Sequence, residues 1–454
     1  MYILEKGKEL SATILTKILN KFNTSDRPKL QHLLDYYEGR QKILQKQPTD
    51  IGKPCNRVVV NYCDCIVNNY LGYLAGKPIT YDNDNFDEVK DILNYNDVVT
   101  EDSEFLRQAL IYGVSYEVNY IDEWGKQRFR LFDSRECIPV YDNTLNNDLM
   151  YVIRYYKEEL ADNIEEQKYI VEVYSDRTVK RYRSNSGFSS FELIEEYPHY
   201  YEQVPVTVFS LNKDEKSIFY KVMNLQDSYN TLVSASIDDV ESFADAYLVL
   251  KGCSADDEDL TRMKENRVLL LDADCSAEYL TKSISDTQVQ NLLININDNI
   301  HKISNSPDFN DEKFAAQTGI AMRLKLTGFE NKASSIEAQM RKALIKRIEL
   351  ISEIVKLTDV EFIWRDVKIN FTRNLPVDLQ ESVNVVNQLR GIVSEKTLLT
   401  LLPFVTNPDE ELEAVKKEKE ENMQLYSFGE TETNDDEEEI EIHNSYLGKL
   451  RDEE

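Results

Sequence analysis

The chain has 454 residues and a formal net charge of −29, from 53 Lys and Arg against 82 Asp and Glu. Hydrophobic residues make up 41%, and with only 14 Gly and 11 Pro this excludes a wholly disordered or collagen-like chain. The length suggests about three domain-sized units. No apolar run approaches the roughly 18 residues of a membrane span, and the charged N-terminus does not resemble a signal peptide. We therefore expect synthesis in the cytoplasm and no membrane segment.

The acidity argues against a static grip on nucleic acid, because a protein that neutralises phosphates needs a basic face. It is concentrated at the C-terminus, where residues 409–454 hold 18 Asp and Glu and 5 Lys and Arg. The like-charge block Asp435–Glu439 repels itself and predicts a solvated, disordered tail over residues 423–454. A calcium site or a partner-binding tail is the alternative interpretation.

The first half of the chain changes its hydrophobic period near residue 111. Residues 1–110 carry apolar side chains at helical spacing, and Gly76-Lys77-Pro78 ends one of the predicted helices. Residues 111–212 alternate as half-buried strands do, which predicts a β-rich lobe with short, antiparallel connections. The predicted strands are 114–120, 127–132, 151–156, 169–174, 179–183 and 205–209.

Long helices dominate residues 216–356. The first runs from about Ser217 to Tyr247, the second from residue 286 to 303, and the third from near Phe314 to Lys356. An αβ insert with a strand at 268–271 separates the first two, and Gly328 predicts a kink or break in the third. Residues 376–422 form short helices, one of them opened by Asn407 as N-cap and Pro408 as first residue.

The first two long helices each carry one narrow apolar stripe and an otherwise polar surface. Such helices are explained by packing beside copies of themselves in a closed ring, whose inner wall would be acidic and amide-rich. The residues of that polar surface are Asp227, Asn230, Ser234, Asp238, Asp239, Glu241, Asn291, Asn295, Asn297, Asp298 and Asn299.

No motif for catalysis, cofactor binding or metal binding stands out. The segment 72–78 has three residues between its glycines and Pro after the Lys, so it is a helix end and not a phosphate loop. Cys55, Cys63 and Cys65 lack the paired spacing of a zinc site and suggest buried structural thiols. We predict no catalytic residue, no cofactor and no metal.

Several stretches resemble one family, the portal proteins of tailed bacteriophages of the SPP1 type. They are 56–81, 138–142 with 153–156, 227–230 with 239–252, 307–314 with 318–325, and 394–399 with 408–412. No single motif is decisive, but their order along one chain is specific. The family usually has Ser-Gly where this chain has Thr318-Gly319, a departure that keeps the hydroxyl.

The resemblance implies an α+β, mainly α subunit that assembles into a ring of about twelve copies. Its parts would be a wing (1–216), a first stem helix (217–250), a clip (251–285), a second stem helix (286–303), a tunnel loop (304–317), a wing helix with a return strand (318–375), a crown (376–422) and the tail (423–454).

The resemblance also implies the function and the partners. The ring would occupy one capsid vertex of the virion, and double-stranded DNA would be pumped through it by the terminase large subunit and later ejected. Major capsid, scaffolding and head-completion or adaptor proteins would dock on it. An acidic cytosolic scaffold or adaptor protein, and a metal-dependent nuclease, are the alternative functions.

The residues expected at the tunnel follow from the same resemblance. Lys313 and Lys302 are the candidates for transient contacts with DNA phosphates, although Lys313 is equally explained as a solvated lysine at a helix start. Thr318 and Gly319 would begin the wing helix. The candidate loop residues are Ser306, Pro307, Asp308, Phe309, Asn310, Asp311, Glu312, Lys313 and Phe314. The two phenylalanines of this loop are alternatively explained as anchors that pack it.

Overall fold

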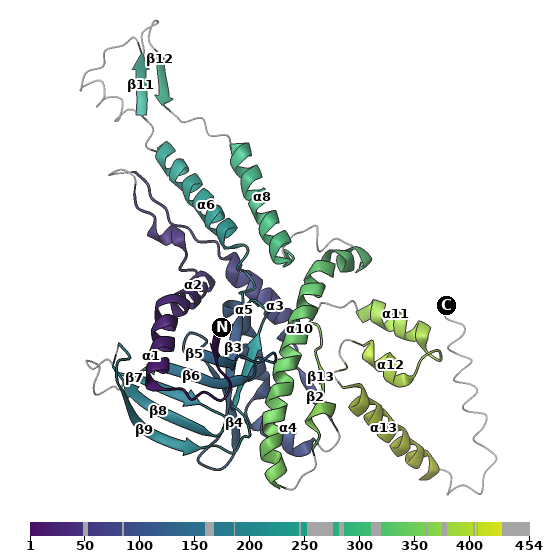
Figure 1. Ribbon diagram of the computed structural model, residues 1–454. Helices are drawn as coiled ribbons and strands as arrows, with labels where there is room; N and C mark the ends of the chain where they lie inside the picture. The colour runs from purple at the N-terminus through teal and green to yellow at the C-terminus, as the bar shows by residue number, and fades with distance from the viewer. Residues whose placement is uncertain are drawn as a thin grey trace, which may run out of the picture. The chain divides into compact units, whose positions relative to one another are not determined.

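The structure is a computed structural model that divides the chain into two compact units, Met1–Asn374 and Leu375–Glu454. It describes residues 1–48, 53–83, 86–158, 168–185, 187–244, 247–251, 276–280, 286–309, 319–358, 362–374, 379–402, 405 and 407–428. The α+β class predicted from the sequence is confirmed (Figure 1).

The N-terminal part of the first unit is helical, as predicted. Its helices are α1 (Ala12–Lys21), a π-helical turn (Phe22–Asp26), α2 (Arg27–Tyr37), α3 (Tyr62–Ala75), α4 (Asp87–Tyr95) and α5 (Val98–Tyr112). The side chain of Ser11 caps α1, and that of Asn61 caps α3. Helix α3 ends before Gly76, where a Cβ atom would collide with the carbonyl of Gly72. The prediction missed two short strands, β1 (Tyr2–Leu4) and β2 (Thr80–Asp82).

The β-rich lobe is built on a six-stranded sheet with the order β1-β5-β6-β7-β8-β9. The strands after β1 are β5 (Cys137–Asp142), β6 (Leu149–Lys157), β7 (Tyr169–Tyr174), β8 (Thr178–Ser184) and β9 (Phe191–Pro198). Pairing is antiparallel throughout except between β1 and β5, which are parallel. One face packs against α1, where Leu15 and Leu19 meet Ile153, Tyr155 and Val171. The prediction missed β5 and β9.

A second, three-stranded sheet with the order β10-β3-β4 packs over the other face. Its strands are β3 (Val114–Ile121), β4 (Gln127–Phe132) and β10 (Val206–Ser210). Because side chains alternate along a strand, Tyr116 and Val118 pack with Val152 and Tyr174 of the larger sheet. Glu117 therefore points the opposite way, toward the long helix α10 (Gly319–Val355).

A buried charge cluster joins α10 to this small sheet and to α5. The fully buried guanidinium of Arg347 donates to Glu117 through Nε at 2.8 Å and Nη2 at 2.6 Å, and to Asp102 through Nη1 at 2.5 Å. The Tyr81 hydroxyl donates to the second oxygen of Asp102 at 2.6 Å. Burial raises the pKa of Glu117 above its usual value despite the attraction of Arg347. The cluster links four elements, since Tyr81 lies on β2, which pairs with β13 (Lys368–Asn370).

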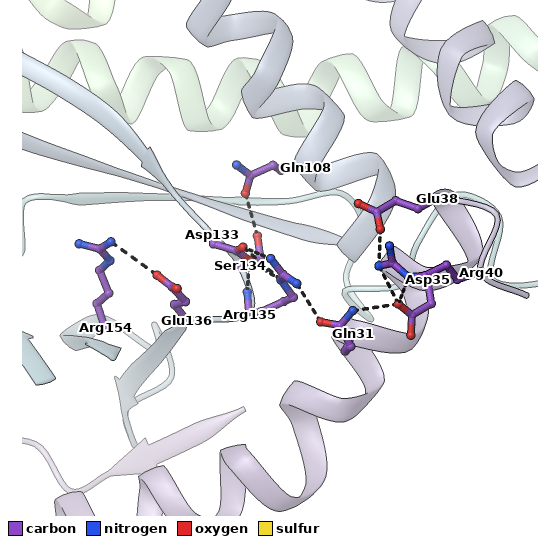
Figure 2. A network of polar contacts seen from close by, with 10 residues as sticks. All are labelled: Gln31, Asp35, Glu38, Arg40, Gln108, Asp133, Ser134, Arg135, Glu136 and Arg154. Atoms are coloured by element: carbon purple, nitrogen blue, oxygen red, sulfur yellow. Dashed lines mark hydrogen bonds and ion pairs between the residues drawn. The ribbon is translucent and has the colours of Figure 1, made fainter. Parts of the chain in front are cut away.

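A partly buried polar network fastens α2 to the larger sheet (Figure 2). Arg135, just before β5, donates to Gln31 of α2 at 2.8 Å, and Gln31 donates to Asp35 at 2.9 Å. Next to it, the Ser134 hydroxyl donates to Gln108 of α5 at 3.3 Å. The helical part and the β-rich lobe are therefore held together by polar contacts as well as by the apolar core.

Two antiparallel helices, α6 (Met223–Ala244) and α8 (Asp286–Ser304), lie side by side (Figure 1). Between them in the chain, β11 (Tyr247–Lys251) pairs antiparallel with β12 (Ser276–Leu280). We call α6, β11, β12 and α8 the arm. Helix α6 is shorter than predicted at both ends, because Ser217 and Ile218 hydrogen-bond to the carbonyl of Leu110 and because β11 begins at Tyr247. The strand predicted at 268–271 lies outside the described residues.

The second unit is helical, as predicted for residues 376–422. Its helices are α11 (Leu379–Leu389), α12 (Glu395–Thr400) and α13 (Pro408–Phe428). Asn407 accepts from the Asp409 amide at 3.1 Å and Pro408 is the first residue of α13, which confirms the predicted helix start. Helix α13 continues six residues into the segment that was predicted to be a disordered tail, and that prediction is wrong up to Phe428. Within the described residues, no helix has the length and apolarity of a bilayer span.

Candidate functional site: the arm and the loop after α8

An extended segment of the N-terminal part lies along α6. Backbone amides at every second residue of this segment donate to side chains at every fourth residue of the helix. The two spacings match, because an α-helix rises about 6 Å over four residues and an extended chain about 6.8 Å over two. The pairs are Tyr62 with Gln226 at 2.9 Å, Val60 with Asn230 at 2.9 Å, Val58 with Ser234 at 3.0 Å and Asn56 with Asp238 at 2.6 Å. We call Gln226, Asn230, Ser234 and Asp238 the polar ladder.

Further contacts close this face of α6. Asn230 donates to Gln41 at 2.5 Å, and Asp227 accepts from the Tyr36 hydroxyl at 2.7 Å. Lys46 lies 2.5 Å from Asp238. Gln226, Asn230 and Ser234 are fully buried. Part of the polar surface that we expected to line a ring is therefore covered by the chain itself, and that expectation is wrong for Asp227, Asn230, Ser234 and Asp238.

The ladder residue nearest the C-terminal end of α6, Asp238, forms an ion pair with Lys46. Burial by itself would raise the pKa of Asp238, but hydrogen bonds from Lys46 and Asn56 outweigh burial and hold the pKa below its usual value. Asp238 is therefore an anion that fixes the positions of Lys46 and Asn56 at physiological pH.

Helix α8 keeps its polar face in solvent. Its apolar stripe packs toward α6 through Ile296 and Ile300, which are buried. On the opposite side, the amides of Asn291, Asn295 and Asn299 are exposed together with Asp298 and Lys302. Lys302 is 72% exposed and lies 3.9 Å from Asp298 one turn earlier. This face is rich in amides and carries almost no net charge.

The loop after α8 is anchored at its start. Asn305 adopts a left-handed conformation with φ of 56°, which ends the helix. Tyr70 of α3 donates to the carbonyl of Ser304 at 2.9 Å, and Asn69 donates to the hydroxyl of Ser306 at 2.9 Å. A ring nitrogen of His301 lies 2.8 Å from the carbonyl of Ser306. Ser304 and Ser306 are buried, so residues 304–306 belong to the packed body of the unit.

The next residues of the loop lie against α10. The Phe309 ring meets Phe329 edge-on, with the ring centroids 6.2 Å apart, while 40% of Phe309 stays exposed. A Cβ atom at Gly328 would lie 3.2 Å from Oδ1 of Asn305, so the glycine allows this close approach. Helix α10 continues without a break through Gly328, and the predicted kink there stays a prediction.

A cavity of about 700 Å³ opens between the end of α8 and α10. His301, Lys302, Asp308, Lys325 and Phe329 are among the residues that line it. The cavity therefore brings together Lys302 with Ser306, Pro307 and Asp308, and Phe309 contacts the lining residue Phe329. Asn310, Asp311, Glu312, Lys313, Phe314 and Thr318 lie outside the described residues, and Gly319 is the first residue of α10.

No cluster in the described ranges gathers three or more His, Cys, Asp or Glu side chains in a geometry that could hold a metal. Cys63 is fully buried on α3, and burial raises the pKa of its thiol. Cys65 is half-buried. The interpretation of buried structural thiols is confirmed for Cys63.

Sequence reasoning missed the polar ladder and the Arg347 cluster. The helix side of the ladder is visible in the sequence, because polar residues recur at every fourth position from 226 to 238. Nothing near Arg347 identifies its partners, which lie 230 and 245 residues away in the chain.

Comparison with known proteins covers both units. The family model described as "Phage portal protein, SPP1 Gp6-like" matches residues 16–425. The chain is 24% identical over 459 residues to the portal protein of Bacillus phage SPP1, which covers 92% of this chain and 88% of that protein. It is 23% identical over 430 residues to the portal protein of Clostridium phage phiCD119, with 87% and 94% covered.

Proposed function

Because the chain belongs to the SPP1 Gp6-like family of phage portal proteins, we propose that its copies form a ring-shaped channel at one capsid vertex. Double-stranded DNA passes through this channel during packaging and again during ejection. The role is structural and not enzymatic. The observation that carries the proposal is the arm, whose two helices are fixed to the body through α6 and exposed to solvent through α8.

The exposed face of α8 has the chemistry that a sliding surface needs. Amide side chains of Asn291, Asn295 and Asn299 form only weak, interchangeable hydrogen bonds with phosphates. The single cation, Lys302, lies beside the carboxylate of Asp298. Charges separated by more than about 8–10 Å are largely screened at physiological salt. A face without net charge therefore gives DNA no deep energy minimum in any register.

A channel surface supplied by α8 alone differs from the acidic inner wall that we expected α6 and α8 to form together. The ladder residues of α6 are engaged with Gln41, Lys46 and residues 56–62 and cannot face DNA in the same state. Helix α8 then supplies the channel surface, and the loop that follows it supplies the narrowest part. Lys302 and Lys313 make transient phosphate contacts at the two ends of this loop.

We assign docking of the other virion components to two parts of the subunit, the insert with β11 and β12 and the β-rich lobe. The insert with β11 and β12 contacts the terminase large subunit during packaging and a head-completion or adaptor protein afterwards. The outer, β-rich part contacts major capsid and scaffolding proteins.

Negative-stain images of the purified protein test the ring directly. We expect closed rings with a central hole, and mass photometry should give one discrete oligomer of about twelve subunits. A strict monomer at all concentrations would contradict the proposal.

DNA packaging tests the channel surface. Charge reversal in Lys302→Glu and Lys313→Glu should lower packaging rates, because a phosphate contact becomes a repulsion. Lys213→Glu, an exposed position outside the arm, makes the same charge change and serves as the control. Unchanged packaging in both the Lys302 and the Lys313 variant would remove the contact role of these lysines while leaving the ring intact.

A further inference from the structure

The last strand of the larger sheet, β9, is an open edge. It is eight residues long, and all but its first residue are exposed. No other strand of the described part pairs with its outer side. Alternate residues of an edge strand direct N–H and C=O groups outward, which makes the edge a template for another extended chain.

In the described part of the six-stranded and three-stranded sheets, the other edges are short or covered. Strand β1 has only three residues. On β4, the side chain of Asn96 donates to the carbonyl of Gln127 at 3.0 Å and accepts from the amide of Phe129 at 3.1 Å, so it occupies the outward groups. Strand β10 is buried beneath α10. The fold therefore closes these edges and leaves β9 free.

The side chains of β9 combine apolar and acidic character. Leu193 is 51% exposed and Ile194 is 42% exposed, and they lie at a bulge where the pairing register with β8 shifts. Glu192 before them and Glu195 and Glu196 after them are exposed. An edge of this composition favours a partner strand with basic residues among apolar ones.

The inner neighbour of β9 already has that composition. Across the pair, Arg183 faces Glu192, Arg181 faces Glu195 and Lys180 faces Glu196. The last of these pairs has its charged atoms 3.3 Å apart. Pairing of β9 with the same strand of a second copy would instead place glutamates near glutamates, which is destabilising. This repulsion disfavours pairing of β9 between two copies. The glutamates of β9 instead favour a basic strand of another protein.

An aromatic cavity adjoins the end of β9. It has a volume of about 510 Å³ and lies beside the point where the strand passes into the segment 198–201. Tyr120, Phe132, Tyr174, Tyr197 and Tyr200 form much of its wall. Tyr200 is 70% exposed, so the cavity is accessible from solvent. A chain that pairs with β9 can place one large side chain here, and such pockets supply specificity when a strand is added to a sheet.

We propose that β9 binds an extended, basic and apolar peptide segment of another protein, which adds a strand to the sheet and inserts an aromatic side chain into the adjoining cavity. This goes beyond the channel function and does not depend on ring assembly, because the edge and the cavity belong to one chain.

Peptide binding to the full-length protein tests the proposal. The probe is a fluorescently labelled peptide with the sequence of β8, residues 178–184, carrying an added Trp at one end or the other. We expect saturable binding that weakens with salt, and at least tenfold tighter binding of one Trp peptide than of its Ala counterpart. The same peptide with alternate backbone amides methylated should not bind, because methylation removes the donors of the ladder.

A charge variant provides the matched control on the protein. The triple substitution of Glu192, Glu195 and Glu196 by Gln should weaken binding at least tenfold and remove most of its salt dependence. The same three-charge change on α13, at Glu411, Glu413 and Glu418, should leave binding unchanged. Thermal unfolding checks that both variants fold.

Three outcomes would overturn the proposal. The first is equal binding of the methylated peptide, which would mean attraction without strand pairing. The second is no binding of any probe at millimolar concentration. The third is displacement of a second copy of the protein by the peptide, which would make the edge an interface between copies.

Discussion

The ladder face of α6 and the exposed face of α8 have similar sequences and opposite roles. Both present Asn, Asp and Ser at helical spacing between apolar residues. On α6, the side chains of Asn230 and Ser234 are buried and take the place of a partner strand for the segment 56–62. On α8, Asn295 and Asn299 remain in solvent. A polar helix face is thus either buried in contacts with another segment of the chain or exposed to solvent. Whether such a segment covers the face decides between the two.

The comparison also explains how a two-helix arm can project from the body without becoming loose. A buried polar group costs free energy when it has no partner, so each ladder residue holds its amide firmly. Exposed amides exchange their hydrogen bonds with water at little cost. The ladder side chains of α6 are therefore held in fixed contacts, whereas the exposed amides of α8 are free to exchange partners.

The largest effect is expected where a buried charge loses its partner. Arg347→Met leaves Glu117 and Asp102 buried without their cation, and should lower the free energy of unfolding by about 3–5 kcal/mol. The matched control is Lys302→Met, which removes a cation that is 72% exposed. Urea unfolding of both variants checks the prediction, and a similar midpoint for the two would contradict it.

A smaller loss in the free energy of unfolding should follow from removing one side chain of the polar ladder. Asn230→Ala leaves the amide of Val60 and the side chain of Gln41 without their partner. The expected cost is about 2–3 kcal/mol. Hydrogen exchange should show faster exchange at residues 56–62 than in the wild type. Asn295→Ala, on the exposed face of α8, is the control and should leave exchange in this segment as it was.

Acid should weaken the contacts that Asp238 makes with Lys46 and Asn56. The pKa of Asp238 is lower in the folded protein than in the unfolded chain, so its stabilising effect is present above the unfolded pKa of about 3.9 and is lost as the pH falls through the folded value. Protease cleavage next to Lys46 and Asn56 should therefore rise in this range. Asp238→Asn should make cleavage less dependent on pH, and an unchanged pH profile would argue against the ion pair.

The smallest effect is expected on the exposed face itself. Lys302→Ala breaks a surface ion pair with a distance of 3.9 Å, and the cost should stay below about 0.5 kcal/mol. Thermal unfolding at low and high salt checks this value. A loss above 1 kcal/mol would show that this lysine has a structural role beyond the pair.

Most elements of the fold could be predicted because their signals are local. The strands of the β-rich lobe that alternate, such as 114–120, and the capped helix at Asn407 are of this kind. The missed strands are irregular in sequence. Strand β9 places Leu193 beside Ile194 without alternation, and β5 contains Pro139, which lacks an amide hydrogen. Strand β1 pairs with β5 only at residues 140–142, so Pro139 needs no donor on that side.

The candidate site was predictable only in part for a similar reason. The arm, the break after Ser304 and the exposed position of Lys302 follow from periodicity and from the family resemblance. The inner wall expected on α6 does not, because the residues that cover it come from 164 to 192 residues earlier in the chain.

The sequence by itself determined the period of each element, the caps that end the helices and the membership of the portal family, since all of these are carried by neighbouring residues or by their order. The tertiary structure alone decided which polar faces are buried, which sheet edge stays open and where Arg347 finds its carboxylates. The physical reason is that the free energy of a polar side chain depends on its partner and on its access to water. Both are set by segments that are distant in the chain.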